Sequence, residues 1–218
     1  MDDPFLQEYL TIVQELESDP SKTVMTRLFH MVDQEYPPAI HTFSVCLEQG
    51  IGVEKNEQHA FEYCKVAADR GNGAALHNMG CNYLDGQYVA KDYELALRYF
   101  SSAAQKGHVA AMHSSACVVD MGIGVAADGD LALRRYTWAY ENGHVQSANN
   151  IGIYFISGKH VKPDERLAQQ WFETGAAKGD MYAIKNLAKL HEWRKSSSPL
   201  TFSEYRKCAN MWLKGDIR

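Results

Sequence analysis

The sequence contains no long apolar run and no region that resembles a secretory signal. No stretch approaches the roughly 20 apolar residues that a membrane-spanning helix requires. The first residues, MDDPFLQEYLTIVQELESD, are acidic and then amphipathic, and they lack the basic region, apolar region and small-residue cleavage site of a signal peptide. We therefore expect a cytoplasmic protein with no membrane partner.

Clustered positive charge is missing as well. The 218 residues include 22 Lys and Arg against 27 Asp and Glu, which gives a formal net charge of −5 at pH 7. Proteins that bind nucleic acids usually carry clustered lysine and arginine. The composition therefore predicts no nucleic-acid partner.

Cysteine is scarce, and its spacing does not support a disulfide framework. The five cysteines are an odd number and form no CxxC motif; they are Cys46, Cys64, Cys81, Cys117 and Cys208. One disulfide between Cys46 and Cys64 stays open as an alternative. Buried free thiols are the interpretation that suits a reducing compartment.

Motifs for catalysis and for metal or cofactor binding are incomplete. His191 and Glu192 begin an HExxH pattern, but Lys195 stands where a zinc protease has its second histidine. The GIG triplets at residues 50–52 and 122–124 continue into neither GxGxxG nor a P-loop. No GxSxG or SxxK motif occurs. We therefore expect no enzyme activity, no cofactor and no metal site.

What the sequence does contain is a residue pattern that returns every 36 residues. A period between about 20 and 50 residues indicates a stacked repeat array. The pattern includes a small residue, a turn glycine, an Asn or Asp, an aromatic residue and a closing glycine. The closing glycines are Gly71, Gly107, Gly143, Gly179 and Gly215; the small residues are Ser44, Gly80, Ala116, Gly152 and Ala188; the turn glycines are Gly50, Gly86, Gly122 and Gly158; the polar residues are Asn56, Asp92, Asp128 and Asp164.

This pattern predicts one helix–turn–helix unit per repeat. Glycine closes a helix by adopting the left-handed conformation, and Asn or Asp accepts hydrogen bonds from the first free amides of the next helix. Small residues that face aromatic residues let two helices pack about 8–10 Å apart.

The pattern A…LG..Y..G.GV..D...A..WY..AA..G resembles the Sel-1-like repeat, a relative of the tetratricopeptide repeat. It is legible in residues 75–107 and 122–143, and the resemblance covers residues 39–179. The resemblance implies an all-α fold, a right-handed α-α superhelix of about twelve helices. We expect an N-terminal helical cap over residues 1–35 and repeats over 36–71, 72–107, 108–143 and 144–179, with a degenerate repeat over 180–215.

In arrays that resemble tetratricopeptide repeats, the first helix of each unit lines a concave groove. Positions that packing does not need are therefore candidates for binding a partner. These candidates are His41, Glu48, His77, Leu84, Asp85, His113, Asp120, Asn149, Ile153, Ile156, Lys185, Lys189 and Trp193.

The recurring histidines, His41, His77 and His113, leave two interpretations open. Ligands bind zinc at about 2.0–2.1 Å, so histidines one repeat apart cannot share an ion. They suit either recognition of a peptide in the groove or hydrogen bonding between neighbouring helices. His108 and His144, which follow closing glycines, are expected to bind helix-end carbonyl groups.

The resemblance implies an adaptor that binds a partner polypeptide in the concave groove. A bacterial immunity protein that neutralises a toxin is an alternative. A weak hydrolase is another, because a few disulfide-rich secreted relatives are β-lactam binders or hydrolases, but this chain lacks their cysteine framework. Tyr205, Met211 and Trp212 either pack inward or form a homodimer contact at the C-terminal end, and we expect a monomer.

Overall fold

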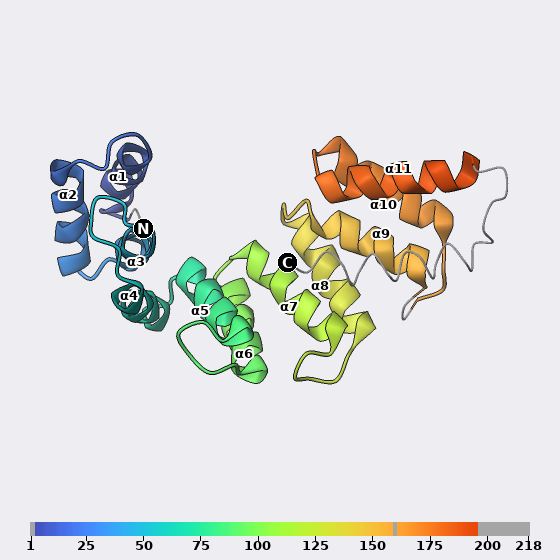
Figure 1. The fold of residues 1–218 in the computed structure, drawn as a ribbon, viewed down its shortest axis with the longest axis horizontal. Helices are drawn as coiled ribbons and strands as arrows, with labels where there is room; N and C mark the ends of the chain where they lie inside the picture. Colours follow the sequence, from blue (N-terminus) through green and yellow to red (C-terminus); the bar gives the residue numbers. More distant parts are fainter. Residues whose placement is uncertain (1–2, 159–160, 196–218) are drawn as a thin grey trace. The chain divides into compact units, whose positions relative to one another are not determined.

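The computed structural model describes residues 3–158 and 161–195, and these residues form eleven α-helices and no strand (Figure 1). The all-α fold is confirmed, with a helix count close to the expected one, and no described helix is long and apolar enough to cross a membrane. The helices are α1 (Leu6–Ser18), α2 (Lys22–Asp33), α3 (Pro37–Gln49), α4 (Glu57–Asp69), α5 (Gly73–Asp85), α6 (Tyr93–Gln105), α7 (Val109–Met121), α8 (Gly129–Glu141), α9 (Ser147–Ser157), α10 (Glu165–Ala177) and α11 (Met181–Lys195).

The caps predicted from the repeat are present at the helix ends. Asn56 caps the start of α4 and accepts a hydrogen bond from the His59 amide at 3.0 Å, and Asp92, Asp128 and Asp164 cap α6, α8 and α10 in the same way. Gly50, which follows α3, has a φ of 75° in the left-handed region, where glycine is favoured.

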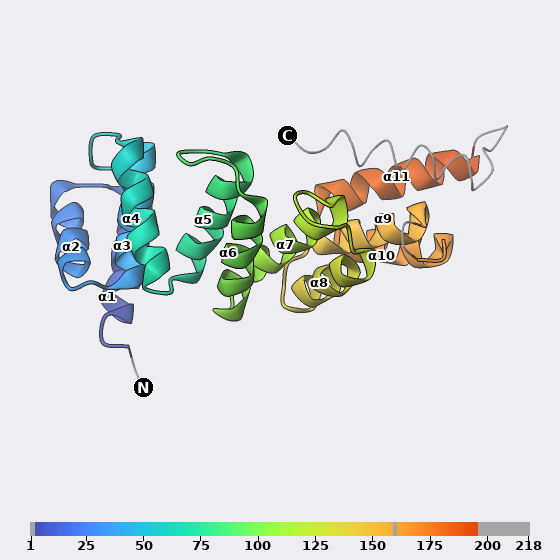
Figure 2. The same cartoon turned by 90° about the horizontal axis from the view of Figure 1, so that it is seen from below.

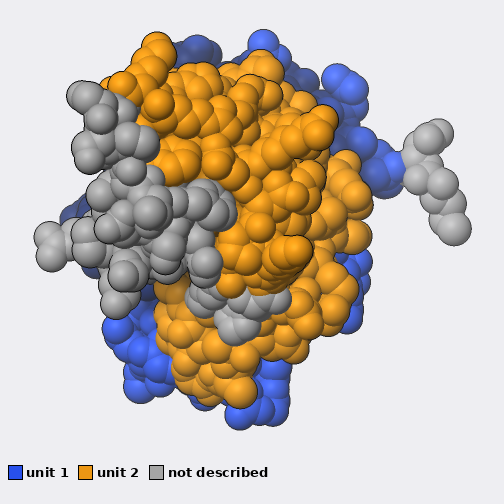
Figure 3. All heavy atoms as spheres, turned by 90° about the vertical axis from the view of Figure 1, so that its right-hand side faces the viewer, with its two compact units in different colours: residues 1–111 blue, residues 112–218 orange. Residues whose placement is uncertain are grey.

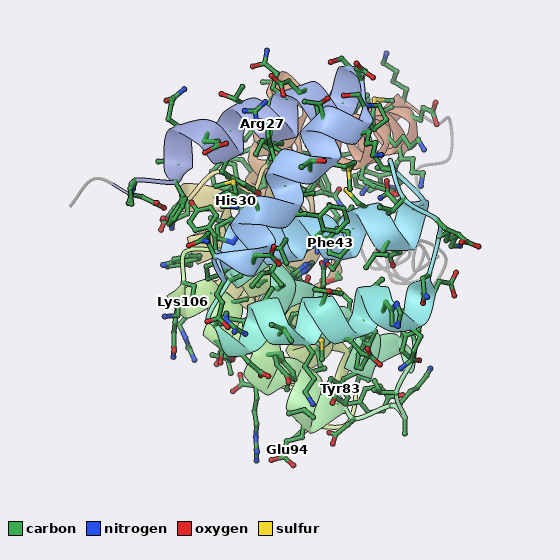
Figure 4. The ribbon with its side chains drawn as sticks, turned by 90° about the vertical axis from the view of Figure 1, so that its left-hand side faces the viewer. Arg27, His30, Phe43, Tyr83, Glu94 and Lys106 are labelled. Atoms are coloured by element: carbon green, nitrogen blue, oxygen red, sulfur yellow. The ribbon has the colours of Figure 1, made fainter. Side chains whose placement is uncertain are left out.

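The chain divides into two compact units, residues 1–111 and 112–218 (Figure 3). In the first unit, α3 packs beside α4 and α5 beside α6 (Figures 1 and 2). The first two helices pack on α3, whose Phe43 is labelled in Figure 4. Phe43 lies between Phe29 of α2 and Tyr63 of α4, with ring centroids 4.8 Å from each. Arg27 of α2 forms an ion pair with Glu15 of α1 at 2.6 Å.

In the second unit, α9 packs against α8, α10 and α11. Its core includes Phe172 of α10 and Leu190 of α11, both fully buried. The first half of the predicted fifth repeat is α11. Tyr205, Met211 and Trp212, and with them the predicted C-terminal dimer contact, lie outside the described residues.

Aromatic rings of the second helices pack onto small residues of the first helices. A Cβ atom on Gly80 would lie 2.5 Å from the Phe100 ring, and one on Gly152 would lie 2.5 Å from the Phe172 ring. Both rings are fully buried. Glycine is therefore required at these positions because the ring takes the space of a side chain.

Candidate functional site

A cavity lies in the first unit where α3, α4 and α5 meet the turn after α5. Its volume is about 180 Å³. The lining residues come from all four segments and are Ser44, Glu48, Ala60, Phe61, Cys64, Asn78, Cys81, Asn82, Gln87 and Tyr88. Most of them carry polar groups, so the cavity differs from a gap in a hydrophobic core.

The cavity exists because the first repeat lacks the aromatic ring of the later repeats. Cys64 stands 36 residues before Phe100, and Ser44 stands 36 residues before Gly80. The ring of Phe100 fills the space above Gly80, whereas the Cys64 thiol is smaller, and both Ser44 and Cys64 line the open space. The departure from the repeat pattern therefore creates the cavity.

The polar lining also departs from the pattern. Glu48 and Asn82 occupy positions that hold Leu84 and Val118 one repeat later. Glu48 is exposed, and its carboxylate has no hydrogen-bond partner among the described residues. Asn78 donates through Nδ2 to His41 Nε2 at 3.1 Å, which leaves its carbonyl oxygen available.

Tyr88, which lines the cavity, has an unusual backbone conformation. Its φ is 64°, and the equivalent positions in the neighbouring repeats are Gly52 and Gly124, with φ of 66° and 67°. A side chain is disfavoured there by about 1–3 kcal/mol. The Tyr88 ring lies 5.8 Å from the Phe61 ring, and its hydroxyl accepts a 2.8 Å hydrogen bond from Gln87 Nε2.

The two thiols in the cavity are protonated at neutral pH. Burial, and then the Glu48 charge, raises the pKa of Cys64 to about 12. Burial, and then the Asp85 charge, raises the pKa of Cys81 to about 11. A thiol reacts as a nucleophile or binds metal through its thiolate, so these groups line the cavity as small, weakly polar side chains.

The predicted binding residues of the first unit differ in their surroundings. Glu48 lines the cavity, and Asp85 is exposed at the end of α5. Leu84 is half-buried. His41 and His77 are also half-buried. His41 pairs with Asn78 of α5, as hydrogen bonding between neighbouring helices requires, whereas His77 stacks on His108 in the turn before α7.

In the second unit, three predicted groove residues are buried. Ile156 is 1% exposed and packs with Phe172 and Leu190, so the expectation that it faces a groove is wrong. Asn149, 7% exposed, accepts a 2.8 Å hydrogen bond from Asn186 Nδ2. Asp120, 8% exposed, accepts a 2.6 Å hydrogen bond from the Tyr154 hydroxyl. The groove assignments of Asn149 and Asp120 are also wrong, because both side chains are buried and their polar groups pair within the fold.

The other predicted residues of this unit keep some exposure. Ile153 and Trp193 are half-buried and pack against the core that contains Ile156. Lys189 is half-buried, and Lys185 is exposed.

Histidine rings form two contact pairs that the sequence did not predict. The His77 ring stacks on His108 at 4.8 Å, and the His113 ring lies 4.3 Å from His144. His108 and His144 therefore pack on histidines of the preceding repeat. His144 Nδ1 also lies 3.0 Å from Ser147 Oγ, and the expectation that the two histidines bind helix-end carbonyls misses these contacts. The fixed interval of 31 residues within each pair, from 77 to 108 and from 113 to 144, was the available signal. Among the described residues no group of three His, Cys, Asp or Glu side chains could hold a metal ion.

A wider hollow of about 700 Å³ lies over α8 and α10 in the second unit. The Trp171 ring lines it and meets the Tyr140 ring edge-on at 5.2 Å. Lys178 places its ammonium group 4.7 Å from the centre of the Tyr140 ring. Trp171 therefore packs at the surface rather than in the core.

Tyr154→Phe is expected to lower the free energy of unfolding by about 1–3 kcal/mol, because it removes the buried hydrogen bond to Asp120. Urea denaturation followed by circular dichroism measures this difference. Tyr182→Phe, on an exposed tyrosine of α11, is the matched control. Equal losses for the two variants would show that the hydrogen bond contributes nothing.

A family model and a solved structure both relate this chain to Sel1 repeat proteins. Sel1 repeats match residues 44–72, 73–108 and 145–180. The crystal structure of a Sel1 repeat protein from Oxalobacter formigenes is similar over 83% of this chain and 74% of that chain, with 30% sequence identity and a TM-score of 0.73. No functionally curated protein matches the chain in sequence.

Two further structures are similar to this chain. One is c5321, a protective antigen present in uropathogenic Escherichia coli strains displaying an SLR fold, with 25% identity over 95% of this chain and 45% of that chain and a TM-score of 0.76. The other is immunity protein Pa5087 from Pseudomonas aeruginosa, with 21% identity over 86% of this chain and 88% of that chain. Its TM-score of 0.45 is too low to support an argument about function. With its capped helix pairs, its 36-residue spacing and its likeness to the Oxalobacter formigenes protein, the chain belongs to the Sel1 repeat family.

Proposed function

We propose that this protein is a non-catalytic adaptor that binds a partner polypeptide on the exposed side of α3 and α5. Sel1 repeats are in general protein–protein interaction modules. The four described cysteines are free thiols, which supports the cytoplasmic setting expected from the sequence.

The observation that carries this proposal is the open polar cavity beside exposed acidic residues. Glu48 lines the cavity and Asp85 is exposed on the same unit. Neither carboxylate has a hydrogen-bond partner among the described residues, so packing does not account for either one. A volume of about 180 Å³ is below the roughly 300–1,000 Å³ of pockets that enclose small molecules. It suits one side chain of a longer ligand.

The second unit offers side chains of a different character. Lys185 and Lys189 on α11 favour an acidic segment, and Ile153 and Trp193 supply apolar surface. Tryptophan is common where binding energy concentrates. We therefore propose these four residues as a second candidate surface, confined to the second unit. No described residue specifically favours the immunity or hydrolase alternatives.

The double variant Glu48→Lys with Asp85→Lys is expected to weaken partner binding by at least about tenfold, because it reverses both charges without touching a buried residue. Affinity capture from the native cell, followed by titration of the captured polypeptide, measures the change. The control variant reverses Glu62 and Glu94, which are exposed on α4 and α6.

One polypeptide retained by the native protein and the control, but lost by the Glu48 and Asp85 variant, would support the proposal. Equal retention by all three proteins would place the binding surface elsewhere. Circular dichroism should show the same helicity for each protein, since all four substituted residues are exposed.

A further inference from the structure

We propose that the cavity between the first two repeats binds an arginine side chain of the partner polypeptide. This inference rests on the proposed function and specifies the chemistry that the partner must present. Its basis is the combination of hydrogen-bond acceptors, an aromatic wall and a volume that fits one side chain.

The cavity offers several hydrogen-bond acceptors and one negative charge. The Glu48 carboxylate accepts at two oxygens, and it is the only formally charged group among the lining residues. Asn78 uses its Nδ2 on His41, and Gln87 uses its Nε2 on Tyr88, so each presents its carbonyl oxygen. A guanidinium group has five donors and no acceptor, and its charge complements Glu48.

The aromatic wall distinguishes a guanidinium from other donors. The rings of Tyr88 and Phe61 lie 5.8 Å apart with an interplanar angle of 41°, and both residues line the cavity. A planar guanidinium stacks on aromatic faces more readily than a compact, strongly hydrated ammonium group. We therefore expect arginine to bind more tightly than lysine.

The strained backbone at Tyr88 indicates that the wall serves a role besides folding. Glycine occupies the equivalent left-handed positions at residues 52 and 124. A tyrosine there lowers stability, and such strain concentrates at ligand sites. The hydrogen bond from Gln87 also fixes the Tyr88 hydroxyl.

A lysine of the chain stands near the cavity without occupying it. Lys55 interacts electrostatically with Glu48 and Tyr88, but its ammonium group is paired with Glu57 at 2.6 Å. The pair with Glu57 leaves the Glu48 carboxylate available to a ligand.

The test titrates the full chain with N-acetyl-L-arginine methylamide and follows backbone amide signals by NMR. The lysine analogue and the citrulline analogue, which is neutral and has nearly the shape of arginine, are the matched probes. We expect saturable shifts at residues 78, 82 and 88 with a dissociation constant on the order of millimolar for arginine. Citrulline should bind about tenfold more weakly.

Three variants probe the three parts of the site. Glu48→Gln should weaken arginine binding about tenfold by removing the charge. Tyr88→Gly removes the ring, suits the left-handed backbone and should weaken binding about fivefold. Cys64→Phe places the ring of the later repeats in the cavity and should abolish binding, and Glu62→Gln on the exposed side of α4 is the control.

Equal binding of arginine and citrulline, shifts outside the cavity, or unchanged binding by Cys64→Phe would each overturn the inference. The same variants in affinity capture separate it from the proposed function. A polypeptide that native protein and Cys64→Phe retain equally would leave the adaptor function standing and remove the arginine site. Arginine binding without any captured polypeptide would overturn the polypeptide as the source of the ligand, and with it the proposed function.

Discussion

Phe100→Ala is expected to lower the free energy of unfolding by about 3–5 kcal/mol, the usual range for removing a buried phenylalanine. The Phe100 side chain is fully buried, and Gly80 opposite it has no side chain that could move into the space. The cavity left behind therefore cannot close by a small adjustment, which places the expected loss at the upper part of the range. Chemical denaturation of the native protein and the variant measures the difference.

Phe29→Ala is the control for this measurement. Phe29 of α2 is 40% exposed and contacts Phe43 at the surface, so its removal should cost less than half as much. A Phe100→Ala loss below about 1 kcal/mol would contradict the role assigned to the aromatic ring in each repeat.

The second large effect is a loss of stability in acid through His113. Burial, and then the nearby His144, lowers the pKa of His113 to about 3. Nδ1 of His113 lies 2.9 Å from Ser147 Oγ, its ring meets Tyr136 at 5.3 Å, and Nε2 lies 3.5 Å from the Cys117 thiol. These neighbours leave a neutral ring well packed and a charged one poorly solvated.

Acid lowers the free energy of unfolding because the unfolded chain binds the proton at a higher pH than the folded protein does. Above about pH 6.5 His113 is neutral in both states and its stabilising contribution is complete. As the pH falls from about 6.5 toward 3, His113 becomes protonated in the unfolded chain but stays neutral in the folded protein, so the free energy of unfolding falls. Between pH 7 and pH 5 this one residue should remove about 2 kcal/mol.

Urea denaturation of the native protein and of His113→Gln at pH 7 and pH 5 measures this contribution. The native protein should lose about 2 kcal/mol more than the variant between the two pH values. Burial also lowers the pKa values of His41, His108 and His144. These residues therefore also lower the free energy of unfolding as the pH falls, in the native protein and in the variant. His59→Gln, an exposed position on α4, is the control, and parallel losses in native protein and His113→Gln would contradict the prediction.

The fold could be predicted from the sequence because its repeating positions are the structural ones. Asn56 and Gly50 mark helix ends through backbone hydrogen bonding and left-handed φ, and both depend on neighbours in the sequence. The pairing of Gly80 with Phe100 is likewise local to one repeat. Features that depend on such nearby residues can be predicted from a sequence.

The binding surface was harder to predict because exposure depends on contacts between repeats. Ile156 and Asp120 share one repeat position with Glu48, yet only Glu48 is exposed. The difference comes from partners such as Tyr154, which belongs to the next repeat and reaches back to Asp120. The cavity residues Cys64 and Tyr88 depart from the pattern, so comparison of equivalent positions was the signal that would have found them.

Each unit of a repeat array is stabilised by its own fold and by the surface it shares with its neighbour. Where α4 meets α5, Cys64 contributes a thiol in place of a ring and lines the cavity that α3, α4 and α5 share. A ligand side chain that enters the cavity takes the place of the missing ring. Partner binding would then fill the space between two repeats, and it would stiffen the joint between them in the same step that recognises the partner.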